Sequence, residues 1–273
     1  LTEALTYPGI KAAAAKLGVR LVGVDMDKEG VLPDALRSAA LRHRPKAVYL
    51  TPTQHNPTTA TLGPERRRAV ADIVSETGMF LIEDDAYGLL EPSVAPIARL
   101  IPERTYLAVG LSKCIAPALR VSFLLAPHAA AEQAMRSTLQ ATSQMPARLM
   151  VALVTHWLKT GTADQIISAI RNEAAGRQNL AGKILKGVPF ASRPSAHHLW
   201  LSLPRHWNAS SFASHILRAG LAVVESGAFA LDQPAPQAVR VSLGAARNRA
   251  ELAQALHLLA AAVDTPASID QIV

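Results

Sequence analysis

Lys113 and Arg120 are the residues whose types and spacing point most directly to chemistry. Lys113 follows a predicted strand over residues 105–109, and Arg120 lies seven residues further on, in the run GLSKCIAPALR. Burial at the end of a strand disfavours the ammonium form of a lysine, so we expect an amine that loses its proton easily. Such an amine forms a Schiff base with a carbonyl cofactor. The planar fork of the arginine suits a phosphate.

Two further motifs stand upstream, each at the carboxyl end of a predicted strand. They are TPTQHNPTTAT at residues 51–61 and IEDDAYG at residues 82–88. In open α/β sheets, ligands bind outside the carboxyl ends of the strands, so we expect these motifs and the lysine to share one rim. The side chains delivered to that rim, strand by strand, are Asn56, then Asp84 and Tyr87, then Lys113 and Arg120.

The order of these residues, followed by Arg240 in a later strand, resembles the pattern of the aminotransferase class I/II family. Members of that family are pyridoxal 5'-phosphate (PLP) enzymes of fold type I. The resemblance extends from Tyr7 to the last predicted helix. It implies an α/β fold whose large domain has a mostly parallel sheet, followed by a smaller C-terminal α+β domain. We expect residues 1–160 to form the PLP-binding large domain, lacking its N-terminal part, and residues 161–273 to form the linking helix and the small domain.

The resemblance implies three catalytic residues. Lys113 matches the lysine that holds PLP covalently. Asp84 matches the acid that pairs with the pyridine nitrogen, keeping it protonated and the ring an electron sink. Tyr87, together with Asn56, matches the hydrogen-bond donors to the phenolic oxygen of the cofactor.

It also implies further binding residues. Tyr7 matches the aromatic residue that stacks on the pyridine ring, and Ser112 and Arg120 match contacts of the phosphate. Arg240 matches the arginine that grips the α-carboxylate of the substrate, a bidentate contact that lysine makes poorly. An arginine paired with a local acid such as Asp232 is the alternative for that position. No residue is expected to bind a metal.

Three positions depart from the family pattern, and none of them removes a catalytic group. Gly110 stands where the family has a serine or threonine that donates to the phosphate. Thr59 and Ala118 stand where the family has glycines.

In the family, a glycine-rich loop that opens a helix holds the phosphate, and it precedes the strand that leads to the position of Tyr7. Only a few residues precede Tyr7 here. We therefore expect the chain to be a piece of a longer protein, to bind PLP weakly as it stands, and to associate, as a homodimer or larger species, through an exposed sheet edge.

Composition fits a globular protein, because 49% of the 273 residues are apolar. No apolar stretch approaches the roughly 20 residues that cross a bilayer, so no membrane contact is expected. The single cysteine, Cys114, excludes an internal disulfide and fits a reducing cytoplasm, where we expect the protein to work. We expect its side chain to be small and buried.

The net charge of +7 raises the question of nucleic-acid binding. The arginines are scattered, and their densest cluster, Arg66 to Arg68, begins a predicted helix. We expect that cluster to be a solvated helix face. His197 and His198 open a strand and point to opposite faces, so a shared metal ion is not expected.

Helical and extended patterns alternate along the chain, as a parallel sheet requires. Helices are expected at 9–17, 33–42, 64–77, 129–159 with a break near Pro146, and 163–186, and a last one capped by Asn248. Strands are expected at 20–24, 46–50, 79–83, 105–109, 120–125, 197–203, 221–226 and 237–243. Successive side chains of a strand point to opposite faces, so in and just after the strand expected at 79–83 Asp84 lies on a different face from Glu83 and Asp85. Glu83 and Asp85 are therefore expected to be structural. His55 is a candidate for lining the substrate pocket.

Two functions share this set of residues. In free-standing aminotransferases the domain moves an amino group between amino and keto acids. In MocR-type regulators of the GntR family it follows an N-terminal DNA-binding domain and senses PLP or an amino compound. The stretches TYPGIKAAA, IEDDAYG and VRVSLGAARNRAEL resemble the regulators. We therefore favour the sensing domain of a regulator, with the aminotransferase as the alternative.

Overall fold

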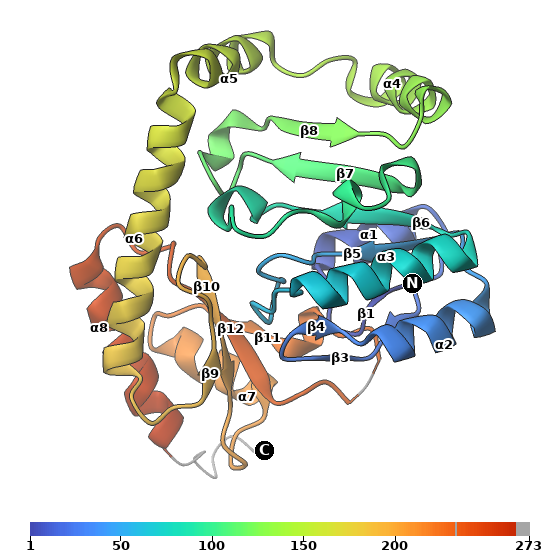
Figure 1. The fold of residues 1–273 in the computed structure, drawn as a ribbon. Coiled ribbons are helices and arrows are strands. Elements are labelled where there is room, and N and C mark those ends of the chain that lie inside the picture. Colours follow the sequence, from blue (N-terminus) through green and yellow to red (C-terminus); the bar gives the residue numbers. More distant parts are fainter. Residues whose placement is uncertain (233, 266–273) are drawn as a thin grey trace. The chain divides into compact units, whose positions relative to one another are not determined.

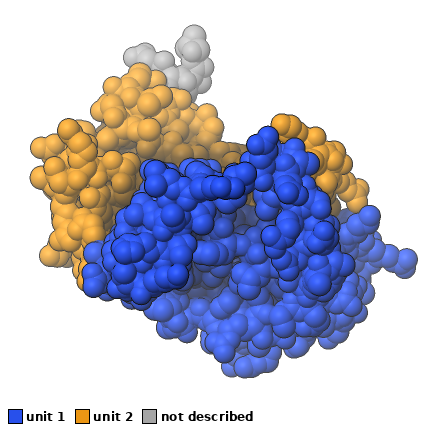
Figure 2. Space-filling view, turned by 90° about the horizontal axis from the view of Figure 1, so that it is seen from above, with its two compact units in different colours: residues 1–3, 24–54, 61–171 blue, residues 4–23, 55–60, 172–273 orange. Residues whose placement is uncertain are grey.

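The computed structural model describes residues 1–232 and 234–265, which form two compact units (Figure 2). Unit 1 comprises residues 1–3, 24–54 and 61–171, and unit 2 comprises residues 4–23, 55–60 and the described residues from Asn172 onward. The long helix α6 (Thr162–Ile184) runs through the change from one unit to the other. The domain boundary expected between residues 160 and 161 stays a prediction.

Unit 1 is built on a six-stranded sheet in the order β2-β1-β5-β6-β7-β8 (Figure 1). The strands are β1 (Thr2–Glu3), β2 (Gly23–Val24), β5 (Ala47–Leu50), β6 (Phe80–Asp84), β7 (Thr105–Gly110) and β8 (Ser122–Leu125). Strands β1, β5, β6 and β7 pair in parallel, whereas β8 runs antiparallel to β7. The predicted fold class, α/β with a mostly parallel sheet, is confirmed.

Helices α2 (Pro33–His43) and α3 (Pro64–Thr77) follow the start signals in the sequence, because each has a proline in its first turn. Helix α3 stops at Gly78, whose φ of +71° is a conformation that glycine adopts readily. Between β2 and α2 lies a short hairpin of β3 (Met26–Asp27) and β4 (Gly30–Val31). The expected break near Pro146 is confirmed, since it separates α4 (Ala129–Ser143) from α5 (Arg148–Thr160).

Four short 3₁₀ helices complete unit 1. They are η1 (Gly88–Leu90), η2 (Ile97–Arg99), η3 (Pro102–Arg104) and η4 (Pro117–Leu119). The first follows β6 and the last follows Lys113, so both lie in the connections that carry predicted site residues.

Unit 2 contains a four-stranded sheet in the order β11-β12-β10-β9, in which neighbouring strands pair antiparallel. Its elements are α1 (Pro8–Lys16), β9 (Phe190–Ala191), β10 (His198–Ser202), α7 (Ala209–Arg218), β11 (Val224–Glu225), η5 (Ser226–Ala228), β12 (Ala238–Ser242) and α8 (Arg249–Asp264). In the core of unit 2, the middle strands β10 and β12 pack against helices α7 and α8. Its buried side chains include Leu199, Phe212, Val239 and Leu256. Helix α8 is capped as predicted, because the Asn248 side chain accepts a hydrogen bond from the Glu251 N–H at 2.9 Å.

No helix in the described ranges is long and apolar enough to span a membrane.

Candidate functional site

Asp84 ends strand β6 and is held by a tyrosine that sequence reasoning missed. The hydroxyl of Tyr49, on β5, donates a hydrogen bond to Asp84 Oδ2 at 2.6 Å. Burial raises the pKa of Asp84, whereas the Tyr49 hydroxyl and the Ala86 N–H favour the carboxylate. The parallel register explains the contact: Tyr49 stands opposite Ile82, and Asp84 lies two residues further on the same face.

Tyr87 lies just after β6, and its side chain is buried in the hydrophobic core of unit 1. That core includes Leu90, Leu111 and Leu119, so it also packs the segment that carries the predicted lysine.

Ser112, Lys113 and Arg120 lie in the turn between β7 and β8. Leu111 and Cys114 are buried and anchor the turn, while the side chains of Lys113 and Arg120 are exposed. The expected burial of Lys113 is therefore wrong for the chain as the structure describes it, because the strand ends at Gly110 and the lysine projects from the following turn. Ser112 is half-buried.

Asp84 and Lys113 nevertheless follow neighbouring strands at the same edge of the sheet. Strands β6 and β7 are parallel, and Asp84 stands opposite Ala108 in the register. The segment after Ala108 therefore continues past the carboxyl end of β6, which is the edge where α/β sheets bind ligands.

Cys114 is buried beside Lys113, as expected. Its sulfhydryl donates to the Gly110 carbonyl at 3.3 Å, and burial raises the pKa of the thiol to about 11. The thiol is therefore a packing group rather than a reactive one at neutral pH.

In unit 2, Asn56 and Arg240 are joined by a hydrogen bond. Arg240 Nη1 donates to Asn56 Oδ1 at 2.8 Å. The guanidinium also lies 5.3 Å from the ring centre of Phe229. In β12, Val239 and Val241 belong to the core of unit 2, whereas Arg240 between them is half-buried.

The surroundings of Asn56 are tightly packed. His55 is fully buried, and its Nδ1 lies 2.8 Å from Thr58 Oγ1. Burial lowers the pKa of His55 to about 4, so this ring is neutral at physiological pH. His55 thus packs inside unit 2.

Tyr7 immediately precedes α1 and is 46% exposed. Gly9 leaves room for the ring, since a Cβ at that position would overlap it. Lys11, one turn further on, donates to the carbonyls of Ala228 at 3.0 Å and Ala230 at 2.6 Å. This lysine, which the sequence did not single out, ties helix α1 to the segment that places Phe229 beside Arg240.

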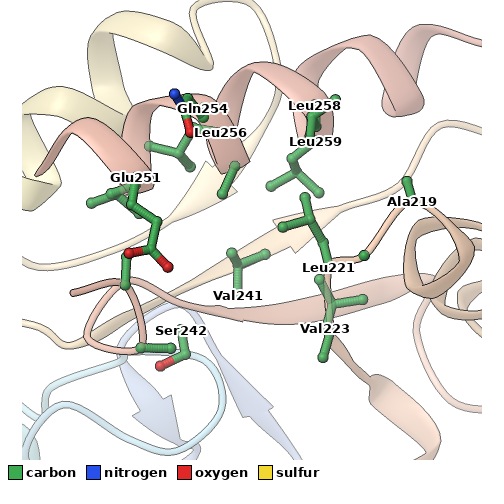
Figure 3. A pocket seen from close by; sticks show the side chains of 16 residues that line it. Ala219, Leu221, Val223, Val241, Ser242, Glu251, Gln254, Leu256, Leu258 and Leu259 are labelled. Atoms are coloured by element: carbon green, nitrogen blue, oxygen red, sulfur yellow. The ribbon is translucent and has the colours of Figure 1, made fainter. Parts of the chain in front are cut away.

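A pocket of about 390 Å³ lies in unit 2 between helix α8, the α7–β11 connection and the end of β12 (Figure 3). Its walls are apolar, with Leu221, Val223, Val241, Leu256 and Leu259, and its polar members include Ser242, Glu251 and Gln254. The predicted site residues lie elsewhere in the chain.

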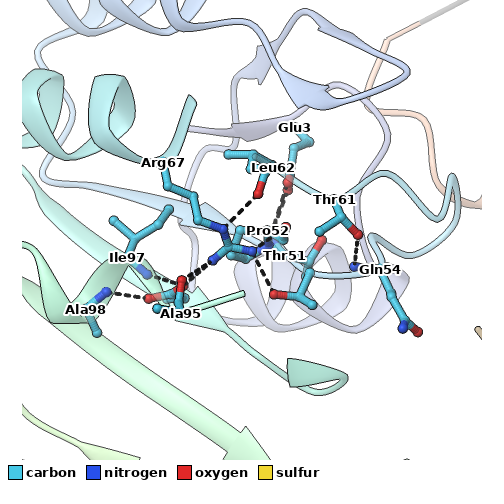
Figure 4. Close-up of polar contacts among 12 residues, drawn as sticks. Glu3, Thr51, Pro52, Gln54, Thr61, Leu62, Arg67, Ala95, Ile97 and Ala98 are labelled. Atoms are coloured by element: carbon cyan, nitrogen blue, oxygen red, sulfur yellow. Dashed lines mark hydrogen bonds and ion pairs between the residues drawn. The ribbon is translucent and has the colours of Figure 1, made fainter. Parts of the chain in front are cut away.

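A buried ion pair in unit 1 corrects the expectation for the arginine cluster (Figure 4). Arg67 is buried in α3 and lies 3.5 Å from Glu83 of β6. Its guanidinium donates to the carbonyls of Pro52, Leu62 and Ala95 and to the hydroxyl of Thr53. The solvated face predicted for this cluster is thus wrong for Arg67, because the first turn of α3 packs against the sheet.

Glu83, which the alternation predicted to be structural, is buried beside this arginine. Glu83 accepts hydrogen bonds from the Ile97 and Ala98 N–H groups, both at 2.8 Å. Burial raises the pKa of Glu83 to about 7, and burial also raises the pKa of Asp85. Glu3, in β1, accepts from the Thr51 N–H at 3.2 Å, and burial raises its pKa to about 8.

Within the described ranges, no group of histidine, cysteine, aspartate and glutamate side chains is arranged to hold a metal ion.

Comparison with known proteins identifies the family. The model of the family "Aminotransferase class I and II" matches residues 1–259. An uncharacterized HTH-type transcriptional regulator of Bacillus subtilis, YdeF, is 30% identical over 95% of this chain and 56% of its own length. The 2-aminoadipate transaminase of Thermus thermophilus is 29% identical over 89% of this chain and 64% of its own length.

Solved structures agree. The α-aminoadipate aminotransferase LysN of Thermus thermophilus, complexed with N-(5'-phosphopyridoxyl)-L-leucine, superposes with a TM-score of 0.87 and 27% identity over 96% of this chain and 70% of its own. The chain spans a little over half of the regulator and about two thirds of the transaminase. With a family match from its first residue into its last helix, this chain belongs to the aminotransferase class I and II family.

Proposed function

We propose that this chain is the effector-sensing domain of a MocR-type regulator of the GntR family. The observation that carries the proposal is the match to the HTH-type regulator YdeF, which covers 95% of this chain but only 56% of the regulator. The family and the solved relatives imply PLP as the cofactor. An amino compound is the proposed effector, and DNA would be bound by a separate domain of the whole protein.

The donor set in unit 1 fits PLP. The cofactor needs an amine for its aldehyde, an acid for its pyridine nitrogen and cationic or hydroxyl groups for its phosphate. Unit 1 offers the side-chain amine of Lys113, the hydrogen-bonded carboxyl of Asp84, and the side chains of Ser112 and Arg120. Bound there, PLP would supply an electron sink for bonds at the amino-bearing carbon of the effector.

We propose the following roles for the residues of unit 1. The carboxylate of Asp84 accepts a hydrogen bond from the ring nitrogen and so keeps that nitrogen protonated. Tyr87, fixed by its place in the core, donates its hydroxyl proton to the phenolic oxygen. Lys113 binds the cofactor through its side-chain nitrogen, and the guanidinium of Arg120 binds the phosphate.

The roles of Tyr7, Asn56 and Arg240 in unit 2 stay predictions. The Asn56 oxygen accepts from Arg240, so the amide of Asn56 presents its NH₂ group as a donor elsewhere. A guanidinium carries its N–H groups in a planar fork, a geometry that suits a carboxylate.

Replacing Arg240 with lysine is expected to weaken the response to amino acids while the spectrum of bound PLP is kept. A bidentate contact to a carboxylate is lost, and hydrogen bonds to charged groups contribute about 1.5–3 kcal/mol, which corresponds to about tenfold or more in affinity. The measurement is a titration of the full-length protein with amino acids, followed by the absorbance of the cofactor. Arg247→Lys is the control, because Arg247 is largely exposed.

An unchanged midpoint in Arg240→Lys would show that another group binds the carboxylate. Loss of the cofactor from the same variant would instead assign Arg240 a structural role.

The alternative function is that of a PLP-dependent aminotransferase acting on an amino acid and a 2-oxo acid. The match to the 2-aminoadipate transaminase of Thermus thermophilus, which covers 89% of this chain, favours it. Two measurements on the full-length protein separate the two functions. A regulator binds DNA and changes that binding when PLP and an amino compound are added, whereas an aminotransferase turns over amino and 2-oxo acids. Turnover of amino and 2-oxo acids without DNA binding would contradict the proposal that the protein is a regulator.

We also propose that the chain associates with itself through strand β8. This strand is last in the sheet order, and Phe123, Leu124 and Leu125 are 43%, 47% and 54% exposed. Exposed apolar edge strands pair with other chains.

A homodimer or larger species is therefore expected in light scattering. Leu125→Lys should shift the chain toward the monomer, because a lysine on an edge strand opposes pairing. Leu217→Lys, on helix α7, is the matched control, since Leu217 is 61% exposed and lies outside the sheet of unit 1. A monomeric parent chain would contradict the proposal.

The cytoplasmic location expected from the single cysteine stays a prediction.

A further inference from the structure

We infer that Tyr49 is a positioning residue for the cofactor acid: its hydroxyl fixes the orientation of the Asp84 carboxylate and keeps it ionised. The inference rests on the proposed role of Asp84 toward the pyridine nitrogen of PLP. Tyr49 is not among the residues that the motifs of the sequence identify.

The geometry leaves Tyr49 little freedom. It lies on β5, between β1 and β6, and its side chain is buried. Its hydroxyl reaches Asp84 Oδ2 at 2.6 Å, a short distance that is typical of a hydroxyl donating to a carboxylate. The bond joins neighbouring strands, so the rigid sheet sets the direction of the carboxyl group.

Tyr49 engages Oδ2, and the carboxylate keeps its second oxygen, Oδ1, as a further acceptor. A carboxylate that accepts hydrogen bonds is oriented by them, and it holds a protonated ring nitrogen more firmly than a freely rotating group. Tyr49 thus acts through Asp84 and makes no contact of its own with the cofactor in this scheme.

The electrostatic surroundings of Asp84 oppose its ionisation, so a hydroxyl that donates to the carboxylate offsets them. Asp84 is largely buried, and burial favours the neutral acid. The other acids that interact with Asp84 are Glu3 of β1 and Asp85 on the adjoining segment, and both would oppose its ionisation when charged. The hydroxyl of Tyr49 and the N–H of Ala86 are the groups that favour the charged form.

The test is Tyr49→Phe, which removes the hydroxyl and keeps the ring. In the ligand-free chain labelled with ¹³C at aspartate carboxyl carbons, the resonance of Asp84 is assigned by its loss in Asp84→Asn. We expect its titration midpoint to rise by about one pH unit or more, because a hydrogen bond donated to the charged form is lost. In the full-length protein, we expect PLP affinity to fall about tenfold or more near neutral pH, and to fall further as the pH is lowered.

Tyr106→Phe is the matched control. Tyr106 stands opposite Ile82 on the other neighbouring strand, β7, and packs edge-on against Phe80 at 5.7 Å. Removing its hydroxyl should leave the Asp84 midpoint and PLP binding unchanged. Urea unfolding of both variants checks that the fold is kept.

The outcomes separate this inference from the proposed function. An Asp84 midpoint that stays the same in Tyr49→Phe overturns the inference, whether or not the parent protein binds PLP. If the midpoint rises in Tyr49→Phe but the parent protein fails to bind PLP, the electrostatic role of Tyr49 is supported and the cofactor assignment is overturned. A shift of the same size in Tyr106→Phe would also overturn the inference, because it would show a general response of the sheet.

Discussion

We expect Lys113→Ala to abolish the covalent attachment of PLP in the full-length protein. In the proposed assignment, the lysine in the turn after β7 supplies the nitrogen that binds the cofactor aldehyde, and alanine has no such group. Reduction with borohydride, followed by peptide mass mapping, should find the pyridoxyl group on Lys113 in the parent protein and on no peptide of the variant. The visible absorption band of the bound cofactor should disappear as well.

Lys159→Ala is the matched control, since Lys159 is an exposed lysine near the end of α5. That variant should keep both the labelled peptide and the absorption band. A label found on Lys46 or Lys159 of the parent protein would contradict the assignment of Lys113.

Arg67→Ala is expected to lower the free energy of unfolding by about 3–5 kcal/mol, which is the usual cost of removing one partner from a buried ion pair. The substitution leaves Glu83 without its cation and removes donors from the carbonyls of Pro52, Leu62 and Ala95. Most small domains have only about 5–15 kcal/mol of stability, so the variant should be close to unfolding. Urea denaturation followed by circular dichroism measures the effect.

Arg68→Ala provides the comparison, because Arg68 is the next residue of the same helix and is exposed. We expect it to change the free energy of unfolding by no more than about 0.5 kcal/mol. The free energy of unfolding of Arg67→Lys should lie between those of Arg67→Ala and Arg68→Ala, since an ammonium keeps the charge but has fewer donors than a guanidinium. Equal stabilities of Arg67→Ala and Arg68→Ala would show that the buried pair contributes little.

Much of the fold could be predicted from local patterns. Prolines in the first turns of α2 and α3, Gly78 at the end of α3 and Asn248 before α8 define helix ends through backbone geometry and capping that neighbouring residues alone determine. The order of strands and helices likewise follows from the spacing of apolar residues, which is a local property.

The sequence was less informative about the length of individual strands and about which side chains are exposed. The strand expected at 20–24 is only Gly23–Val24, and Lys113 is exposed where burial was expected. Whether a side chain is buried depends on what packs over it, and that comes from segments distant in the chain.

The sequence by itself determined which chemical groups this protein carries and in what order, because strand ends, turns and motif residues such as Asp84 and Lys113 are set by neighbours in the chain. Only the tertiary structure decided which of those groups touch. Tyr49 meets Asp84 across 35 positions, and Arg240 meets Asn56 across 184. Arg67 looks like one member of a basic surface run, yet it is enclosed by Glu83 and backbone carbonyls. These contacts depend on strand register and on the packing of α3 against the sheet, and no pattern of spacing along the chain encodes either one alone.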